Sequence, residues 1–289
     1  MNPVKVFFQS NIFISLAAVS LTGQTQIQLG LKPHWQPYLL FIFFAVLFEY
    51  NLHRLLSVLV NREDLNPEKH RCKGENRKEI IFLVFVSGAG LFGSAFFVKW
   101  NTLFAFIPLA LLTLMYSILI FGKRNDLFRF RRIPFLKMFL ISFVWSTSTV
   151  ILPVIQSPEN FDRIHAALMI AERFFFIFAI AIPFDIRDME EDRLAGLKTL
   201  PLLLNENKAR TLSYLSLLVF FLISIFHYQS RNDWFIIGAM GVSTWITYFF
   251  IRMKTFRKLS WYYSGILDGT MIIQGLLVMA FYYFFADLK

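Results

Sequence analysis

The sequence predicts an all-α fold, a polytopic membrane protein of about nine transmembrane helices. Two observations lead to this fold class. Hydrophobic residues make up 56% of the 289 residues, charged residues make up 17%, and 36 residues are Phe, which is more apolar surface than a soluble domain of this length can cover. The apolar residues also form long runs that are almost free of charge, and runs of about 18 or more are typical of transmembrane helices.

Each predicted helix corresponds to one of these runs. In chain order they span residues 10–29, 36–60, 80–98, 102–121, 136–155, 164–184, 211–228, 233–251 and 265–286. All are close to the length that crosses a hydrocarbon layer of about 30 Å. The first run follows Lys5 and contains small residues, as a cleaved signal peptide does, but we expect it to remain as a span. No second soluble domain and no obvious repeat is visible, so we expect a single transmembrane domain over residues 1–289.

Lys and Arg gather in the longer polar loops, at residues 61–79, 122–135, 185–210 and 252–263, while the opposite loops are short and carry few. Because cytoplasmic loops are rich in Lys and Arg, we expect these loops and the N-terminus in the cytosol, with the protein in the bacterial inner (cytoplasmic) membrane. The net charge of +10 then reflects loops that face anionic lipid, not nucleic acid. The single Cys72 excludes a disulfide framework and a multi-cysteine metal site.

The stretch "FDIRDMEEDRLAGLKTLP" at residues 184–201 places five carboxylates directly after the sixth apolar run. If the helix continues past Pro183 or restarts there, Asp185, Asp188 and Asp192 fall within about 60° of one another on one face. Like charges about 6 Å apart repel by roughly 3 kcal/mol per pair at an effective dielectric of 20. A cation is therefore expected beside them.

A hard cation suits this cluster, because the ligands are oxygens with no His or Cys nearby. Mg²⁺ is commonly held by one or two carboxylates and keeps substrate phosphates in its other positions. Arg193 and Lys198, just downstream, are then placed to contact phosphate oxygens. The alternative is a solvated charged loop in which Arg187, Arg193 and Lys198 balance the acids.

The stretch "DIRDMEEDRLAGLKTLP" resembles the second aspartate-rich motif of the UbiA-type membrane prenyltransferases, including the Gly-x-x-Thr-Leu tail at Gly196, Thr199 and Leu200. The segment "LMYSILIFGKRNDLFRFRRIPFLKMFLISFVW" at 114–145 is similar to the one that joins the family's fourth and fifth helices, and "GILDGTMIIQ" at 265–274 looks like the start of its last helix. The resemblance implies a helical bundle around a central cavity that is open to the cytosolic side and sideways to lipid. It also implies transfer of an isoprenoid chain from its diphosphate, with Mg²⁺ as the cofactor.

On this resemblance, Asp188 and Asp192 are the expected catalytic residues, and Asp185, Asp188 and Asp192 are the expected metal ligands. The residues expected to bind the diphosphate are Asn51, Arg54, Lys137, Arg193 and Lys198. The expected partners are a prenyl diphosphate, a hydrophobic acceptor such as a quinone precursor, and the lipid bilayer. No nucleic acid is expected, and no protein partner can be inferred.

The chain departs from the family at the first aspartate-rich motif, which normally reads Asn-Asp-x-x-Asp. In "FEYNLHRLLSVLVNREDLNPEKHR", Asn51 matches the Asn, but Leu52 and Leu55 stand where the carboxylates belong. Either Arg54 contacts the diphosphate in place of a metal, or Glu49 or Asp64 supplies a displaced ligand, or the protein has lost prenyl transfer. Under the first alternative, Arg54 and Asp188 face a common cavity.

The predicted function is therefore Mg²⁺-dependent transfer of an isoprenoid chain to an acceptor in the membrane. The alternative is a non-enzymatic lipid-binding, isoprenoid-binding or transport protein on the same scaffold. Transporters often carry charges at mid-membrane depth, whereas most of the charge here lies at the cytosolic rim. Glu172 and Arg173 lie inside the sixth run and form either part of a cavity wall or a structural pairing. For Asp268 a helix cap or interhelical hydrogen bond is favoured over a metal site, and His53 is expected to lie just behind the site.

Overall fold

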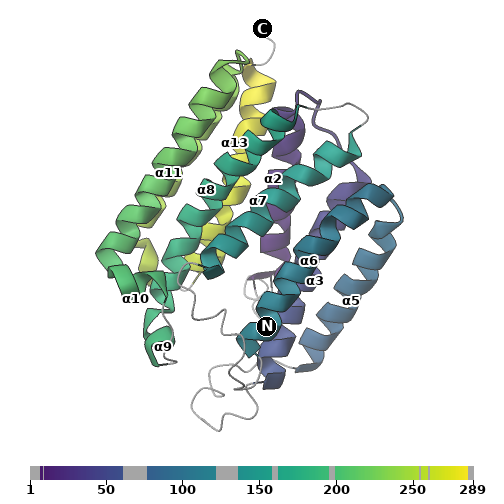
Figure 1. The fold of residues 1–289 in the computed structure, drawn as a ribbon, viewed down its shortest axis with the longest axis vertical. Helices are drawn as coiled ribbons and strands as arrows, with labels where there is room; N and C mark the ends of the chain where they lie inside the picture. Colours follow the sequence, from purple (N-terminus) through teal and green to yellow (C-terminus); the bar gives the residue numbers. More distant parts are fainter. Residues whose placement is uncertain are drawn as a thin grey trace.

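The computed structural model describes residues 7–8, 10–60, 77–121, 136–157, 162–194, 199–253, 255–259 and 261–285, without the side chains of residues 57, 60, 115–121 and 191. These residues are helical and contain no strand (Figure 1). The long helices are α2 (Ile12–Gln28), α3 (Pro37–Val60), α5 (Arg77–Ala95), α6 (Trp100–Phe121), α7 (Leu136–Gln156), α8 (Arg163–Arg187), α11 (Glu206–Gln229), α12 (Trp234–Arg252) and α13 (Asp268–Phe285). The short elements are α9 (Met189–Leu194), α10 (Leu200–Leu204), η2 (Phe256–Lys258) and η3 (Tyr262–Leu267).

Within the described residues, seven helical stretches are long and apolar enough to cross a membrane. They are α3, α5, α7, α8, α11, α12 and the continuous stretch of η3 and α13. The other two predicted runs coincide with α2, which has 17 residues, and with α6, whose described side chains form a shorter apolar helix. The all-helical membrane fold is confirmed, while the total of nine spans stays a prediction.

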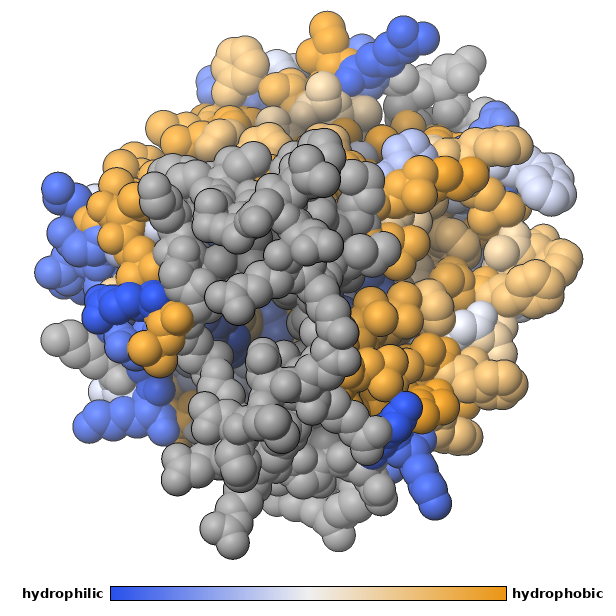
Figure 2. All heavy atoms as spheres, turned by 60° about the horizontal axis from the view of Figure 1, so that its bottom comes forward, coloured by the Kyte–Doolittle hydropathy of each residue, from blue (hydrophilic) through white to orange (hydrophobic). Residues whose placement is uncertain are grey.

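The helices lie side by side along the long axis of the molecule (Figure 1). The helix α2 packs against α3, α7 and α13, and α8 packs against α7 and α11. We call the end of the bundle where α8 finishes at Arg187 and α9 begins the acidic end. Figure 2 shows this end, with hydrophilic residues around its rim and hydrophobic residues on the adjoining flank.

The bundle carries apolar side chains on its outer face and polar side chains inside. Phe82, Phe85 and Phe92 project outward from α5, and Phe85 is 74% exposed, as expected of a surface that faces lipid. In contrast, Glu172 and Arg173 in α8 are each 1% exposed. Because ionisable groups are expensive inside a membrane, these two residues require partners within the bundle.

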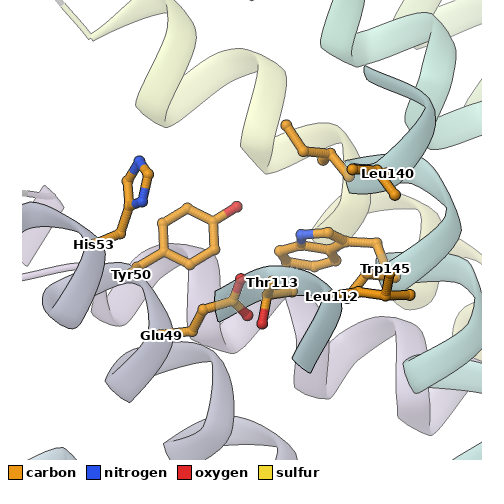
Figure 3. A pocket seen from close by; sticks show the side chains of 9 residues that line it. Glu49, Tyr50, His53, Leu112, Thr113, Leu140 and Trp145 are labelled. Atoms are coloured by element: carbon orange, nitrogen blue, oxygen red, sulfur yellow. The ribbon is translucent and has the colours of Figure 1, made fainter. Parts of the chain in front are cut away.

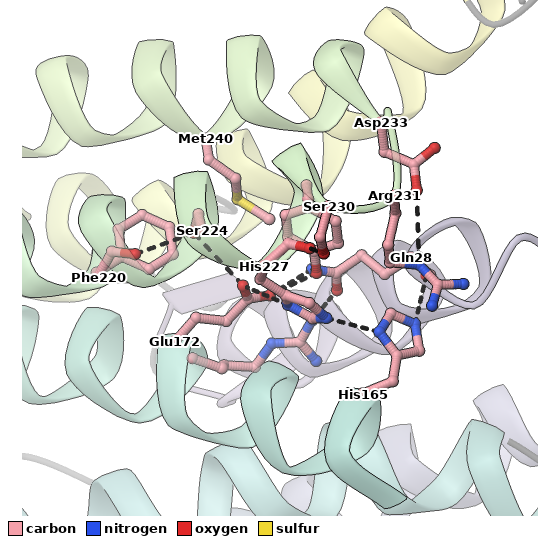
Figure 4. Close-up of polar contacts among 12 residues, drawn as sticks. Gln28, His165, Glu172, Phe220, Ser224, His227, Ser230, Arg231, Asp233 and Met240 are labelled. Carbon is pink, nitrogen blue, oxygen red and sulfur yellow. Dashed lines mark hydrogen bonds and ion pairs between the residues drawn. The ribbon is translucent and has the colours of Figure 1, made fainter. Parts of the chain in front are cut away.

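Those partners are neighbouring polar side chains (Figure 4). The Arg173 guanidinium donates to the hydroxyls of Thr25 and Thr149, at 2.7 and 3.0 Å, and to Gln28 Oε1 at 2.7 Å. Gln28 Nε2 in turn donates to Glu172 Oε1 at 2.6 Å. Glu172 and Arg173 therefore form a structural pairing through Gln28, and neither lines a described cavity of the acidic end.

Two histidines and a tyrosine extend this cluster. The Tyr228 hydroxyl donates to Glu172 Oε1 at 2.8 Å, and His227 Nδ1 lies 3.4 Å from Glu172 Oε2. His165 Nδ1 lies 2.6 Å from His227 Nε2, and its Nε2 lies 2.9 Å from the Gln28 carbonyl oxygen. The cluster, which we call the buried polar network, joins α2, α8 and α11 (Figure 4). It includes the last residue of α2 and lies near the start of α8 and the end of α11, towards the end of the bundle opposite the acidic end.

A close backbone approach joins α2 to α13. A Cβ atom placed on Gly275 would lie 2.7 Å from the Ser20 carbonyl oxygen, so the position has no room for a larger residue. The Ser20 hydroxyl also donates to the Ile272 carbonyl oxygen at 3.2 Å. Small residues at such contacts let membrane helices pack backbone to backbone.

Candidate functional site

The helix α8 carries the acidic stretch because the chain stays helical through Pro183. Asp162 caps the start of α8 by accepting a hydrogen bond from the Ile164 amide at 3.0 Å. The helix continues to Arg187, Asp188 is its C-cap, and the Asp192 amide donates to the Asp188 carbonyl oxygen at 2.9 Å. Of the two possibilities that the sequence leaves open, the structure has the helix continuing past Pro183.

The carboxylates of Asp185 and Asp188 lie beside two cations of the chain. Lys137 Nζ, at the start of α7, lies 2.7 Å from Asp185 Oδ1 and 3.8 Å from Asp188 Oδ2. The Arg187 guanidinium donates to both oxygens of Asp188, at 2.6 and 3.1 Å. The side chain of Asp185 is 4% exposed and that of Lys137 is 37% exposed, so this cluster reaches from the interior of the bundle to its surface.

Two aromatic rings hold the Arg187 guanidinium in place. Its carbon lies 5.3 Å from the centre of the Phe184 ring and 4.8 Å from that of Tyr263. Cation–π contacts of this kind fix a guanidinium while leaving its edge open to hydrogen bonds. Arg187 is therefore oriented towards the same carboxylate that Lys137 approaches.

These charged groups line a cavity of about 390 Å³, which we call the larger cavity. Its polar lining consists of Tyr50, His53, Lys137, Asp185, Arg187, Asp188 and Asp268. The rest of the wall is apolar and comes from α2, α7, α8 and α13, with Trp145 and Phe184 among the contributors. The larger cavity thus joins a charged region to an apolar one, which suits a ligand with an anionic head and a hydrocarbon chain.

The carboxylates of Asp185 and Asp188 suit a hard cation whose other ligands come from a bound phosphate group. In the described part of the chain, no three His, Cys, Asp or Glu side chains are placed to hold a metal ion together. Asp185 and Asp188 nevertheless present oxygen ligands to one cavity. Mg²⁺ is held in this way, by one or two carboxylates and by the phosphates of a substrate. The chemistry of these donors therefore fits Mg²⁺ that arrives with a phosphorylated ligand.

The other residues of the acidic stretch lie away from the larger cavity. Asp192 and Arg193 are in α9, and neither lines that cavity. The Arg193 side chain is 59% exposed and pairs with Glu190 at 3.1 Å. Lys198 lies outside the described residues. The structure thus brings Asp185 and Asp188 to the larger cavity together with Lys137, and places Asp192 on the next turn.

The altered first motif is placed differently from what the sequence suggests. Asn51 is buried, and its amide contacts Asn11 and the carbonyl oxygens of Ser10 and Leu47 at 2.8–3.1 Å, which ties α3 to the segment before α2. These bonds engage the Asn51 amide in packing, and its predicted contact with the diphosphate stays a prediction. From α3, His53 lines the larger cavity together with Asp188, whereas Arg54 does not line it. Arg54 lines neither of the two described cavities, and the expectation that it shares a cavity with Asp188 stays a prediction.

Glu49 and Asp64 were the alternative sources of a metal ligand. Glu49 lines a second cavity of about 140 Å³, the smaller cavity, and does not line the larger one (Figure 3). Asp64 lies outside the described residues. The smaller cavity lies between α3, α6 and α7, and it shares Tyr50, His53, Ile141 and Trp145 with the larger cavity.

Sequence reasoning missed the aromatic residues, and for Asp268 it favoured a helix cap or an interhelical hydrogen bond over a site role. Tyr50, Trp145 and Phe184 line the larger cavity, but nothing in the sequence distinguishes them from the many other aromatic residues of the chain. Asp268 lines it as the first residue of α13, directly after the π-helical turn η3. Its position inside a stretch that resembles a family segment was the one available signal.

Comparisons with known proteins identify the family and the fold. The sequence profile of the UbiA prenyltransferase family matches residues 74–264. By sequence, no curated protein matches the chain.

Among solved structures, the chain is similar to a UbiA homolog from Aeropyrum pernix K1, with a TM-score of 0.63, 16% identity, and 96% of this chain and 99% of that chain covered. It is also similar to a UbiA homolog from Archaeoglobus fulgidus bound to GPP and Mg²⁺, with a TM-score of 0.60, 16% identity, and 93% and 98% covered. A digeranylgeranylglyceryl phosphate synthase gives a TM-score of 0.57 at 12% identity, with 97% and 98% covered.

Proposed function

Because the chain belongs to the UbiA prenyltransferase family, we propose that it transfers an isoprenoid chain from a prenyl diphosphate to a hydrophobic acceptor, with Mg²⁺ as cofactor. The family and the apolar helices indicate an integral membrane protein. The observation that carries the proposal is the larger cavity, where Asp185 and Asp188 face Lys137 and Arg187 at one end of an apolar wall. The neighbour bound to GPP and Mg²⁺ supports the substrate class and the cofactor.

The cations of the larger cavity bind the diphosphate in this proposal. Lys137 and Arg187 are held at the cavity by Asp185 and Asp188, and charge-assisted hydrogen bonds from such groups to phosphate oxygens are strong. A guanidinium also matches two phosphate oxygens at once. The diphosphate thus takes over part of the hydrogen bonding that the carboxylates now supply.

The carboxylates released in this exchange hold the metal. Asp185 and Asp188 are the proposed ligands, and Asp192, on the next turn, is the third candidate. When bound, Mg²⁺ would neutralise charge on the diphosphate and make it a better leaving group. Arg193 and Lys198 stay predicted contacts of the outer phosphate oxygens.

The bond changes of the transfer are simple. The bond between the isoprenoid C1 and the diphosphate oxygen breaks, and its electron pair leaves with the diphosphate. The acceptor forms the new bond to C1 and releases a proton. Tyr50, Trp145 and Phe184 line the larger cavity, and aromatic faces of this kind stabilise the allylic cation that forms as the bond breaks.

The orientation of the protein is part of the proposal. Residues 185–210, one of the segments rich in Lys and Arg, begin at the acidic end of α8, so under the positive-inside rule we propose that this end faces the cytosol, where water-soluble diphosphates are available. The bacterial inner membrane is the proposed location. The competing function is binding or transport of a lipid without chemistry, and turnover separates the two.

The test is release of diphosphate by the purified full-length chain. The protein in lipid nanodiscs is incubated with radiolabelled geranyl diphosphate and a panel of ring acceptors, with Mg²⁺ or with EDTA. We expect Mg²⁺-dependent release of diphosphate and a labelled, prenylated product, both lost in Asp188→Ala. Glu190→Ala is the matched control, because this carboxylate is 68% exposed on α9 and lies outside the larger cavity. Binding of geranyl diphosphate without turnover of any acceptor would favour the binding or transport protein.

A further inference from the structure

The end of α12 and the short helix η2 carry positive charge that no nearby acid in the sequence balances. Residues 234–267 contain no Asp and no Glu, but they contain four cationic residues close together, namely Arg252, Lys254, Arg257 and Lys258. Within the described residues, no ion pair engages Arg252, Arg257 or Lys258. Arg252 and Lys258 are also exposed. Their charge is therefore available to an anion from outside the chain.

Short contacts hold two guanidinium groups at this end of α12. Arg252 donates to the Tyr248 hydroxyl, and its guanidinium carbon lies 5.6 Å from the centre of the same ring. Arg257 donates to the carbonyl oxygens of Ile251 and Arg252, at 2.9 and 3.2 Å. These last carbonyl groups of a helix carry partial negative charge, so Arg257 is kept beside Arg252. Guanidinium groups held in this way suit the charged oxygens of a phosphate group.

The face of α12 that carries Arg252 continues as an apolar surface along α11. Trp245, Tyr248 and Arg252 follow one another at spacings of three and four residues, so they lie on one face of α12. The Tyr248 ring meets that of Tyr214 on α11, with ring centres 5.1 Å apart. Trp245 is 66% exposed, and Leu218, one turn after Tyr214, is 50% exposed. We call this surface, with Arg252 at its end, the α11–α12 seam.

The α11–α12 seam has the polarity and the length of a lipid molecule. Arg252 and Trp245 are seven residues apart, which corresponds to about 10 Å along the helix. One leaflet contributes half of a hydrocarbon layer of about 30 Å. With Arg252 at the level of the headgroups, Trp245 therefore lies at the depth of the acyl chains. A free phosphate ion would contact only the charged end of the seam, whereas a phospholipid contacts both ends.

We propose that the α11–α12 seam binds one anionic phospholipid, whose phosphate contacts Arg252 and whose acyl chain lies along Trp245. Arg257 and Lys258 add positive charge beside the phosphate. Basic sites between membrane helices bind anionic headgroups in this way, whereas a zwitterionic headgroup brings its own cation against these side chains. The inference goes beyond the proposed function, and its test involves no prenyl transfer.

The test measures which lipid lies against Trp245, through the quenching of tryptophan fluorescence by bromine. The full-length chain is placed in vesicles of phosphatidylglycerol and phosphatidylcholine at one fixed ratio, and the acyl chains of one lipid or the other carry the bromine. We expect brominated phosphatidylglycerol to quench more, with an affinity about tenfold above that of phosphatidylcholine, because several cations face one headgroup. Trp245→Phe should remove this excess. Trp234→Phe should keep it, because Trp234 is 57% exposed at the other end of α12.

A matched pair of charge variants separates a defined site from a diffuse attraction. Arg252→Gln should lower the relative affinity for phosphatidylglycerol about fivefold, which is the contribution of one cation near an anionic headgroup. Lys258→Gln should lower it as well, and this variant leaves the contact between Arg252 and Tyr248 intact. Lys208→Gln removes the same charge from an exposed position at the start of α11, at the same end of the bundle. It should bind phosphatidylglycerol as the wild type does.

The proposal is overturned if the two brominated lipids quench the wild type equally, or if the excess survives in Trp245→Phe. It is also overturned if Arg252→Gln and Lys208→Gln lose affinity equally, since the attraction would then be diffuse. Inorganic phosphate added to the same vesicles should leave the excess unchanged, because the ion cannot replace the acyl chain at Trp245. If inorganic phosphate abolishes the excess, the charged end binds a phosphate ion, and the assignment to a lipid is wrong.

Discussion

Replacement of Arg173 by Met should be among the most destabilising single changes in this protein. The Arg173 side chain is 1% exposed and donates three hydrogen bonds, to Thr25, Thr149 and Gln28. Interhelical hydrogen bonds in membrane proteins are worth about 0.6 kcal/mol each on average, or about 2 kcal/mol for the three. The change also leaves Glu172 as a buried carboxylate without its cation, and removing one partner of a buried pair costs about 3–5 kcal/mol in total.

The assay is thermal unfolding in detergent, followed by the loss of monomeric protein on size exclusion. A destabilisation of about 3–5 kcal/mol predicts a fall in melting temperature of roughly 10 °C for a chain of this size. The double variant Glu172→Gln/Arg173→Met removes both charges, so it should recover about half of that fall. Arg163→Met is the control on the same helix, because Arg163 is exposed, and its melting temperature should be unchanged.

The result that refutes this reasoning is an Arg173→Met variant that unfolds within about 1 °C of the wild type. In that case the buried polar network contributes no net stability, and its bonds exchange freely with others inside the bundle. At temperatures where the variant stays folded, we expect it to bind geranyl diphosphate normally, since Arg173 does not line the larger cavity.

Two further predictions concern the larger cavity and the packing of α2 on α13. Lys137→Met should weaken binding of radiolabelled geranyl diphosphate about tenfold, because one charge-assisted hydrogen bond is lost. Lys137→Arg should retain most of the affinity. If Lys137→Met binds geranyl diphosphate as tightly as the wild type does, Lys137 is not part of the diphosphate site. Gly275→Ala should destabilise the fold by about 1–3 kcal/mol, because the added Cβ meets the Ser20 backbone and overpacking strains a core. Gly93→Ala is its control, since a Cβ there meets nothing within 4 Å, and equal melting temperatures for the two variants would contradict the close approach.

The positions of the helices could be predicted because a hydrocarbon layer imposes a length and an apolar composition on every span. The run predicted at 164–184 is Arg163–Arg187 in the structure, and that predicted at 265–286 is covered by η3 and α13 up to Phe285. The continuation of α8 through Pro183 is one of the two possibilities that the sequence leaves open, since membrane helices tolerate proline. The composition of each segment therefore predicts the helices, and with them the positions of Asp185 and Asp188 near the end of α8.

The cavity walls could not be predicted, because they depend on how distant helices rotate against one another. The motif comparison pointed to Asn51 and Arg54, whereas packing directs the Asn51 amide to Ser10 and Asn11 and brings His53 to the larger cavity. The smaller cavity likewise arises only where α3, α6 and α7 meet. The spacing of residues within one segment does not predict which distant helices contact one another.

The ion pairs at the acidic end have a consequence for the order in which ligands load. With Lys137 on Asp185 and Arg187 on Asp188, the charges of the two ion pairs cancel, so the two paired carboxylates offer a lone divalent ion little attraction. A diphosphate that binds Lys137 and Arg187 would take these partners away from Asp185 and Asp188, so the two carboxylates would become available to a metal ion at the same time. Under the proposed function, and since such coupling is reciprocal, magnesium and the diphosphate are each expected to raise the apparent affinity of the other, so that the protein binds both together or neither.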